Sequence, residues 1–357
     1  MTRFTIDEKM DDPLVSSPAQ LSLVRPELKR KLLLLLTLFL FASGLCFAIL
    51  HSIVSTVVFL SIVAAGFIIP LTMALFVLHP IRTRPQHTPA TFGIAAWEEV
   101  SFRSSDQIEL RGWFILPDPN GDGATLVFAH GLGGNRGQLL HDAAVLVAKG
   151  YGALLFDLRN HGTSGGTITT LGYAEADDVQ NAFAYLLTRR EVNPEKIGLV
   201  GYSMGGAAAL RAAVQLPQVK AVVAESTYNS LEDNIASGVL TQTGLPAFPF
   251  ALFMLWLGER LTGLKIHQVR PIDDVLRIAP RPVLLVHGAK DHMVHAFNSI
   301  KLYNATEGPR GLYILPNIRH AELSSVDPNE FATRVTGFLD WAVRGIERRK
   351  TPRANHF

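Results

Sequence analysis

Residues 201–206 read Gly-Tyr-Ser-Met-Gly-Gly, and they lie between an apolar run typical of a strand and an alanine-rich run typical of a helix. A G-x-S-x-G pattern in this position indicates a sharp turn that exposes the serine hydroxyl. Glycine at both flanks allows a backbone too tight for residues with side chains. The sequence therefore predicts Ser203 as a nucleophile. The N–H of Met204, at the start of the helix, is a candidate oxyanion donor.

A serine hydroxyl is a weak nucleophile, so it needs a base, and the base needs an acid to orient it. In this arrangement the acid follows the serine in the chain and the histidine comes last, each after a strand. Asp291 and His320 each follow an apolar run in that order. We expect Asp291 to orient His320, which accepts the Ser203 proton. Glu225, at the end of another apolar run, is an alternative acid.

A glycine-rich loop at residues 131–135 follows the apolar run 124–130. Such a loop lets the backbone approach a substrate closely, and we expect the N–H of Leu132 to be the second oxyanion donor beside Met204. A nucleotide-binding interpretation of residues 131–137 fails, because the Lys-Ser/Thr pair of a phosphate loop is absent from the sequence.

Five motifs stand in order along the chain: residues 130–135, 157–164, 201–205, 287–291 and His320. With these motifs, residues 97–346 resemble the α/β-hydrolase superfamily. The branch they resemble is that of bacterial serine hydrolases related to the prolyl-oligopeptidase and dienelactone-hydrolase-like groups. The resemblance implies an acyl-transfer hydrolase with a mostly parallel eight-stranded sheet and no cofactor. Asn160 stands where these proteins usually have glycine, and Arg319 stands where glycine often precedes the last histidine.

The apolar pattern predicts an α/β domain whose strands and helices alternate. An antiparallel hairpin comes first, and the nearly all-apolar strands that follow are typical of a parallel sheet covered by helices on both faces. The carboxyl ends of parallel strands meet at one edge, where the candidate residues can converge. The expected strands are 97–103, 108–116, 124–129, 153–157, 196–200, 220–224, 281–288 and 311–315, and the expected helices are 136–149, 174–189 and 207–216.

The alternation breaks between residues 226 and 275, which is too long for a plain connection in a compact domain. We interpret residues 227–275, approximately, as a cap insertion. Its stretch 246–257 is strongly apolar. Two interpretations stay open: a cap helix buried against the domain, or a segment that lines an acyl pocket or dips into a membrane interface.

Residues 32–50 and 53–78 are apolar and without charge. A spanning helix needs about 20 such residues. We therefore expect a transmembrane helical hairpin at 31–78 in a multi-pass protein of the cell membrane. Basic residues flank the hairpin on both sides and its turn has none, so both ends and the catalytic domain are expected in the cytoplasm. The single cysteine, Cys46, lies in the first span and excludes an intrachain disulfide.

The expected division of the chain is a disordered cytosolic arm (1–30), the hairpin (31–78), a semi-rigid linker (79–96), the hydrolase domain (97–348) and a tail (349–357). A net charge of +2 without basic aromatic patches gives no case for nucleic acid. No metal is expected either, because the histidines near Asp291 lack the spacing of metal ligands.

Three further polar residues have structural interpretations. We expect His130 and His161 to brace loops by hydrogen bonds, and Asp157 to pair with Arg159 or to cap a loop.

The functional hypotheses follow from the site and the hairpin. The first hypothesis is a membrane-anchored serine hydrolase of carboxylic esters or thioesters, with a small-molecule or lipid acyl-ester substrate. A peptidase with the same site and a catalytically silent scaffold are the alternatives. The acyl length and the oligomeric state are left open.

Overall fold

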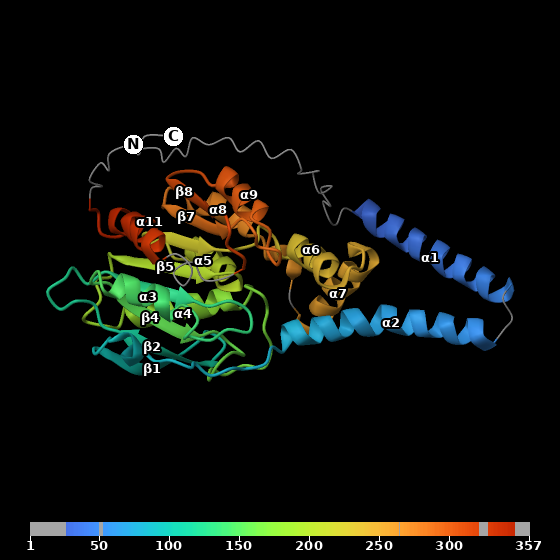
Figure 1. Ribbon diagram of the computed structural model, residues 1–357, viewed down its shortest axis with the longest axis horizontal. Helices are drawn as coiled ribbons and strands as arrows, with labels where there is room; N and C mark the ends of the chain where they lie inside the picture. Colours follow the sequence, from blue (N-terminus) through green and yellow to red (C-terminus); the bar gives the residue numbers. More distant parts are fainter. Residues whose placement is uncertain (1–25, 50–52, 264, 321–327, 347–357) are drawn as a thin grey trace.

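The computed structural model describes residues 26–49, 53–263, 265–320 and 328–346 (Figure 1). Most of the predicted arm at 1–30 and the whole predicted tail at 349–357 lie outside these residues. The described part of the arm, residues 26–30, is already helical, because the first helix, α1, covers Pro26–Ile49. Its start is therefore five residues earlier than the predicted span.

An eight-stranded sheet forms the core, in the order β1-β2-β4-β3-β5-β6-β7-β8. β1 and β2 form the predicted antiparallel hairpin, β2 also runs antiparallel to β4, and the other neighbours are parallel. The predicted mostly parallel sheet is thus confirmed. The strands are β1 (Trp97–Arg103), β2 (Glu109–Ile115), β3 (Thr125–Ala129), β4 (Gly152–Asp157), β5 (Ile197–Tyr202), β6 (Val222–Glu225), β7 (Val283–Gly288) and β8 (Arg310–Leu315).

Helices cover both faces of this sheet, as the apolar strands predict. α3 (Leu140–Val147) and α11 (Pro328–Ala342) pack on one face. The other face carries four helices, and side chains from alternate strand positions join them in a second core. These four are α4 (Glu175–Leu186), α5 (Met204–Gln215), α8 (Pro271–Ile278) and α9 (Phe297–Ala305).

Among the elements of the α/β domain, the largest difference in bounds is at α3, which begins at Leu140 rather than at residue 136. Hydrogen-bonded turns occupy the preceding residues, because Gln138 N–H donates to the carbonyl of Asn135 and Leu140 N–H to that of Gly137. The side chain of Asn135 accepts from Gly137 N–H as well. Local side-chain bonds of this kind compete with the helix, and they extend the glycine-rich loop toward α3.

The cap consists of α6 (Leu231–Thr243), α7 (Ala247–Thr262) and the short η2 (Ile266–Gln268). Ser230 begins α6 as an N-cap, since its hydroxyl accepts from Asp233 N–H at 3.2 Å. The predicted end of the cap at 275 is wrong. α8 packs against α5 and belongs to the helix layer of the sheet.

α2 (Ile53–Leu78) is a long apolar helix that runs beside the cap helix α7 (Figure 1). Within the described residues, one segment, Thr56–Leu78, is long and apolar enough to cross a membrane, and most of it is exposed. Pro70 lies inside α2 without ending it. Membrane insertion of the predicted hairpin, including a first span in α1, and the cytoplasmic side of the domain stay predictions.

Residues 79–96, predicted as a spacer, instead lie on the α/β domain. Arg82 donates to the carbonyl of Ser164 at 2.8 Å, and Thr83 accepts from the Asn135 side chain at 3.0 Å. A short helical turn, η1 (Pro89–Phe92), follows, and its residues pack near α3. The segment is therefore part of the folded unit, because polar groups of the domain satisfy its backbone and side chains.

Candidate active site

Ser203 occupies the turn between β5 and α5 with φ 52° and ψ −116°, a conformation that side-chain-bearing residues rarely adopt. Its own N–H donates to the Glu225 carbonyl at 2.7 Å, which fixes the turn against β6. The flanking glycines are required by close packing. A Cβ on Gly201 would collide with the carbonyl of Gly205, and a Cβ on Gly205 would collide with the carbonyl of Ala129. Strain of this kind typically costs about 1–3 kcal/mol and is concentrated at functional sites.

The structure brings the three predicted side chains together at the carboxyl edge of the sheet. His320 Nε2 lies 3.1 Å from Ser203 Oγ, and His320 Nδ1 lies 2.6 Å from Asp291 Oδ2. These residues follow β5, β7 and β8, so the fold supplies each from a different strand end. Because a carboxylate only accepts, Nδ1 carries the proton and Nε2 is free to accept one from the serine.

Asp291 is fully buried and its two carboxylate oxygens are both satisfied. Oδ1 accepts from the N–H groups of Met293 and Val294, both at 2.9 Å, so the carboxylate also holds the loop that follows β7. Burial favours the protonated form, but hydrogen bonds from His287 and His320 outweigh it and hold the pKa of Asp291 well below its usual range. The carboxylate therefore remains charged beside His320.

The rival acid, Glu225, is buried at the end of the neighbouring strand β6. Its backbone carbonyl holds Ser203 N–H, as described above. The imidazole of His320 has a single proton on Nδ1, and it donates this proton in the 2.6 Å hydrogen bond to the Asp291 carboxylate. Glu225 thus contributes its backbone to the serine turn, and Asp291 holds the histidine.

His287 is a neighbour of the site that the sequence did not indicate. Its Nε2 lies 2.7 Å from the Val294 carbonyl and 3.2 Å from Asp291 Oδ2, and a carbonyl only accepts, so Nε2 carries a proton. Nδ1 is 2.7 Å from the Ser299 hydroxyl. The only available signal was a polar residue ending an apolar strand. With both ring nitrogens engaged inside the protein, His287 supports Asp291.

The glycine-rich loop begins directly against the serine turn. A Cβ on Gly131 would lie 2.9 Å from the ring of Tyr202 and 3.4 Å from the Cβ of Ser203. Leu132, the next residue, has a partly exposed side chain. Met204 opens α5, where N–H groups have no partner within the helix. The two candidate donors thus come from two segments that meet at Ser203.

His130 and His161 brace this loop as neutral imidazoles, as predicted. His130 Nε2 accepts from Leu158 N–H at 3.0 Å, so its Nδ1 donates to the Gly131 carbonyl at 2.8 Å. His161 Nε2 accepts from Gly133 N–H at 3.0 Å. Burial, and then the neighbouring His161, lower the pKa of His130 to about 3. Burial also lowers the pKa of His161.

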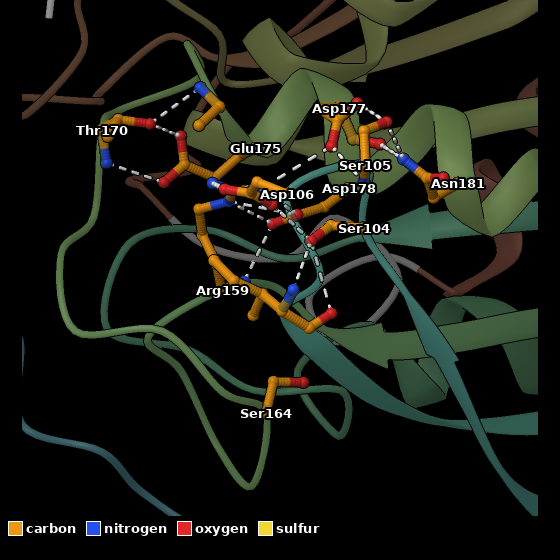
Figure 2. Close-up of polar contacts among 12 residues, drawn as sticks. Ser104, Ser105, Asp106, Arg159, Ser164, Thr170, Glu175, Asp177, Asp178 and Asn181 are labelled. Carbon is orange, nitrogen blue, oxygen red and sulfur yellow. Dashed lines mark hydrogen bonds and ion pairs between the residues drawn. The ribbon is translucent and has the colours of Figure 1, made fainter.

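Figure 2 shows how the segment that carries His161 is held in place. The buried guanidinium of Arg159 donates to Asp178 at 2.7 Å and to Asp106 at 2.9 Å. The predicted pairing of Arg159 with Asp157 is therefore wrong. Asp157 takes the other predicted role, that of a loop cap, because its carboxylate accepts from Arg136 N–H at 2.7 Å and Thr163 N–H at 2.8 Å. Backbone donors lie closer to Asp157 than any guanidinium.

A family model described as the alpha/beta hydrolase fold matches residues 124–252. The chain also superimposes on the solved structure of the Pyrococcus furiosus esterase Pf2001 with a TM-score of 0.62. The protein has the fold of the alpha/beta hydrolase superfamily. This likeness to Pf2001 has 25% sequence identity and covers 75% of this chain and 98% of the esterase.

Three further proteins resemble this chain in fold or in sequence. The Pyrococcus horikoshii acylaminoacyl peptidase matches with a TM-score of 0.55 and 18% identity, over 73% of this chain and 44% of the peptidase, which concerns the fold alone. The protein YfhR of Escherichia coli O157:H7 is 29% identical over 242 residues, or 66% of this chain and 78% of YfhR. The alpha/beta hydrolase domain-containing protein WAV2 of Arabidopsis thaliana is 29% identical over 226 residues, or 60% of this chain and 68% of WAV2.

Proposed function

We propose that the protein is a serine hydrolase that cleaves carboxylic esters or thioesters through an acyl-enzyme on Ser203. One observation carries the proposal: the His320 ring lies between the Ser203 hydroxyl and the buried Asp291 carboxylate, at 3.1 and 2.6 Å. A base within hydrogen-bond reach of the serine and an acid that fixes its tautomer are what nucleophilic catalysis by serine requires.

In the first half-reaction, Ser203 Oγ attacks the substrate carbonyl carbon while His320 Nε2 takes the hydroxyl proton. The negative charge that forms on the carbonyl oxygen is held by the N–H groups of Leu132 and Met204. Asp291 stabilises the imidazolium. As the tetrahedral intermediate collapses, the bond to the leaving group breaks and His320 returns the proton to that group.

In the second half-reaction, His320 Nε2 removes a proton from water, and the resulting oxygen nucleophile attacks the acyl-enzyme carbonyl. Collapse releases the carboxylic acid, and His320 gives the proton back to Ser203 Oγ. The cycle uses no cofactor. One water is consumed, and Ser203 and His320 return to their starting protonation states.

Acyl or lipid-type esters are the substrate class that the surroundings favour. The cap beside the site is rich in apolar side chains, with Ala251 and Met254 buried and Trp256 exposed. The likeness to an esterase of 25% identity points the same way. The alternative, a peptidase, is supported by the likeness to the acylaminoacyl peptidase. However, this chain matches only 44% of that protein, which weakens the alternative.

We further propose that residues 31–78 anchor the enzyme in the cell membrane as two spans, with the catalytic domain in the cytoplasm. The length and apolar surface of α2 support the second span. A run of exposed leucine and phenylalanine side chains in α1, such as Leu36 and Phe39, supports the first. The basic residues at both ends of the hairpin support the cytoplasmic side.

Labelling with a fluorophosphonate probe tests the function. The wild-type chain is expected to be labelled and to hydrolyse p-nitrophenyl esters, whereas Ser203→Ala is expected to lose both activities while its melting temperature stays close to that of the wild type. Peptide amides, assayed in parallel, separate the esterase from the peptidase. A folded wild-type protein that the probe never labels would leave only the scaffold alternative.

A further inference from the structure

The cap helix α7 lies between the candidate active site and α2. On one side, Leu255 packs against a cluster that contains Ala207 and Val294. Ala207 lies one helical turn after Ser203 in α5, and Val294 lies in the loop that carries Asp291. On the other side, Met254 belongs to a cluster that includes Met73 of α2. One structural element, α7, therefore packs both on the domain that carries the candidate site and on the apolar helix α2.

Aromatic rings continue from α2 across the surface of the cap. Phe67 of α2 meets Phe253 of α7 edge to face at 5.2 Å, and Phe253 stacks on Trp256 at 5.7 Å. The side chain of Trp256 is 57% exposed, and that of Phe248 in the same helix is 44% exposed. An apolar surface of this kind, continuous with the exposed face of α2, is a marker of a lipid or protein contact.

The position of these contacts along α2 favours lipid. Leu78 ends the helix, and Gly66, Phe67 and Met73 are among the residues of α2 that lie against α7. At about 1.5 Å per residue, these contacts lie about 8 to 18 Å from the end of the helix. A helix that crosses a hydrocarbon core of about 30 Å with Leu78 at its surface therefore carries α7 to a depth within that core.

The orientation of α2 relative to the domain is fixed by hydrogen bonds at the end of the helix. The Leu78 carbonyl accepts from the Asn160 side chain at 3.1 Å and from Thr169 N–H at 2.9 Å. Arg82 donates to the side chain of Asn160 at 3.1 Å and to the carbonyls of Ser164 and Gly166. Asn160 is the residue that departs from the usual glycine, and here it joins the helix to the segment that carries His161.

We propose that the exposed face of the cap, formed by Leu240, Phe248 and Trp256, lies in the lipid bilayer beside α2. The substrate is then a long-chain amphiphilic ester that reaches Ser203 from the bilayer. The route of the substrate rests on the proposed function, whereas the location of the cap in the bilayer does not. The charged residues that follow on α7, Glu259 and Arg260, stand at the end of the helix, where they can reach the headgroups.

Tryptophan quenching tests the location of the cap without any catalysis. The full chain is reconstituted in phosphatidylcholine vesicles whose acyl chains carry bromine at defined depths. Brominated lipid is expected to quench a component of the fluorescence that disappears in Trp256→Phe. Trp341→Phe is the matched control, since Trp341 lies on α11, is partly buried and packs against the core of the α/β domain, and this variant should keep the quenched component. Equal quenching of the wild type and Trp256→Phe would overturn the proposal.

A second measurement tests the route of the substrate. Trp256→Glu is expected to lower kcat/KM for a long-chain ester presented in vesicles by about tenfold or more, because a carboxylate is costly in hydrocarbon. Hydrolysis of water-soluble p-nitrophenyl acetate should change by less than about twofold, because Trp256 lies on the exposed side of the cap helix. An equal fall for both esters, or no fall for either, would contradict lateral entry. A wild type that hydrolyses neither ester would instead reject the proposed function and leave the quenching result standing.

Discussion

At the scale of single residues, the site depends on which carboxylate holds His320. Asp291 and Glu225 are both buried at the ends of adjacent strands, and the imidazole Nδ1 donates to Asp291 at 2.6 Å. An amide at this position accepts through one atom and donates through the other, so it would favour the tautomer in which Nε2 carries the proton and cannot accept from Ser203.

Asp291→Asn is therefore expected to lower kcat for ester hydrolysis by about 10⁴-fold. Glu225→Gln is the matched variant, and it should keep kcat within about tenfold, because the contribution of Glu225 to the turn is its backbone carbonyl. Initial rates with a p-nitrophenyl ester, on variants checked for folding by circular dichroism, decide between them. A larger loss in Glu225→Gln than in Asp291→Asn would assign the orienting acid to Glu225 instead.

At the scale of elements, α1 and α2 extend from the domain as two helices (Figure 1). The side chain of Cys46, in α1, is exposed in the structure and would face lipid in a membrane hairpin. It is the only cysteine of the chain, so it reports on α1 without background.

In intact membranes, Cys46 is expected to resist a membrane-impermeant maleimide and to react fully after solubilisation in dodecyl sulfate. An Ile81→Cys variant, made in a Cys46→Ser background, serves as the control, since Ile81 lies just past α2 and is exposed. It should react in inverted vesicles and stay protected in intact cells. Labelling of Cys46 in both kinds of membrane would place α1 in water and refute the first span.

At the scale of the whole molecule, the fold buries titratable groups whose pKa shifts change its stability with pH in opposite directions. The folded-state pKa of His130 is about 3, whereas an unfolded histidine titrates near about 6.5. The unfolded chain therefore binds a proton first, and the stability that neutral His130 provides above about pH 6.5 is lost as the pH falls toward 3. Burial raises the pKa of Asp178 and Asp274 to about 6, which acts in the opposite direction.

The contribution of His130 is isolated by comparison with His130→Gln, whose amide can accept from Leu158 N–H and does not titrate. Between pH 7 and pH 5, the free energy of unfolding of the wild type, relative to the variant, is expected to fall by about 2 kcal/mol. Denaturant unfolding of the detergent-solubilised full chain, followed by fluorescence, measures it. A difference that does not vary with pH would mean that His130 is not held neutral.

The sequence by itself determined most of the architecture, because the parallel strands are buried on both faces and so appear as apolar runs between glycine-rich turns. It also predicted that Ser203, Asp291 and His320 lie close together, since a tight turn and the ends of strands leave clear local patterns. Only the tertiary structure decided between partners that several residues could supply. Asp291 rather than Glu225 reaches His320, and Asp178 rather than Asp157 pairs with Arg159, because strand register and loop packing set those distances. Likewise, the contact between α2 and the cap joins segments about 180 residues apart along the chain, a separation that no local pattern of side chains encodes.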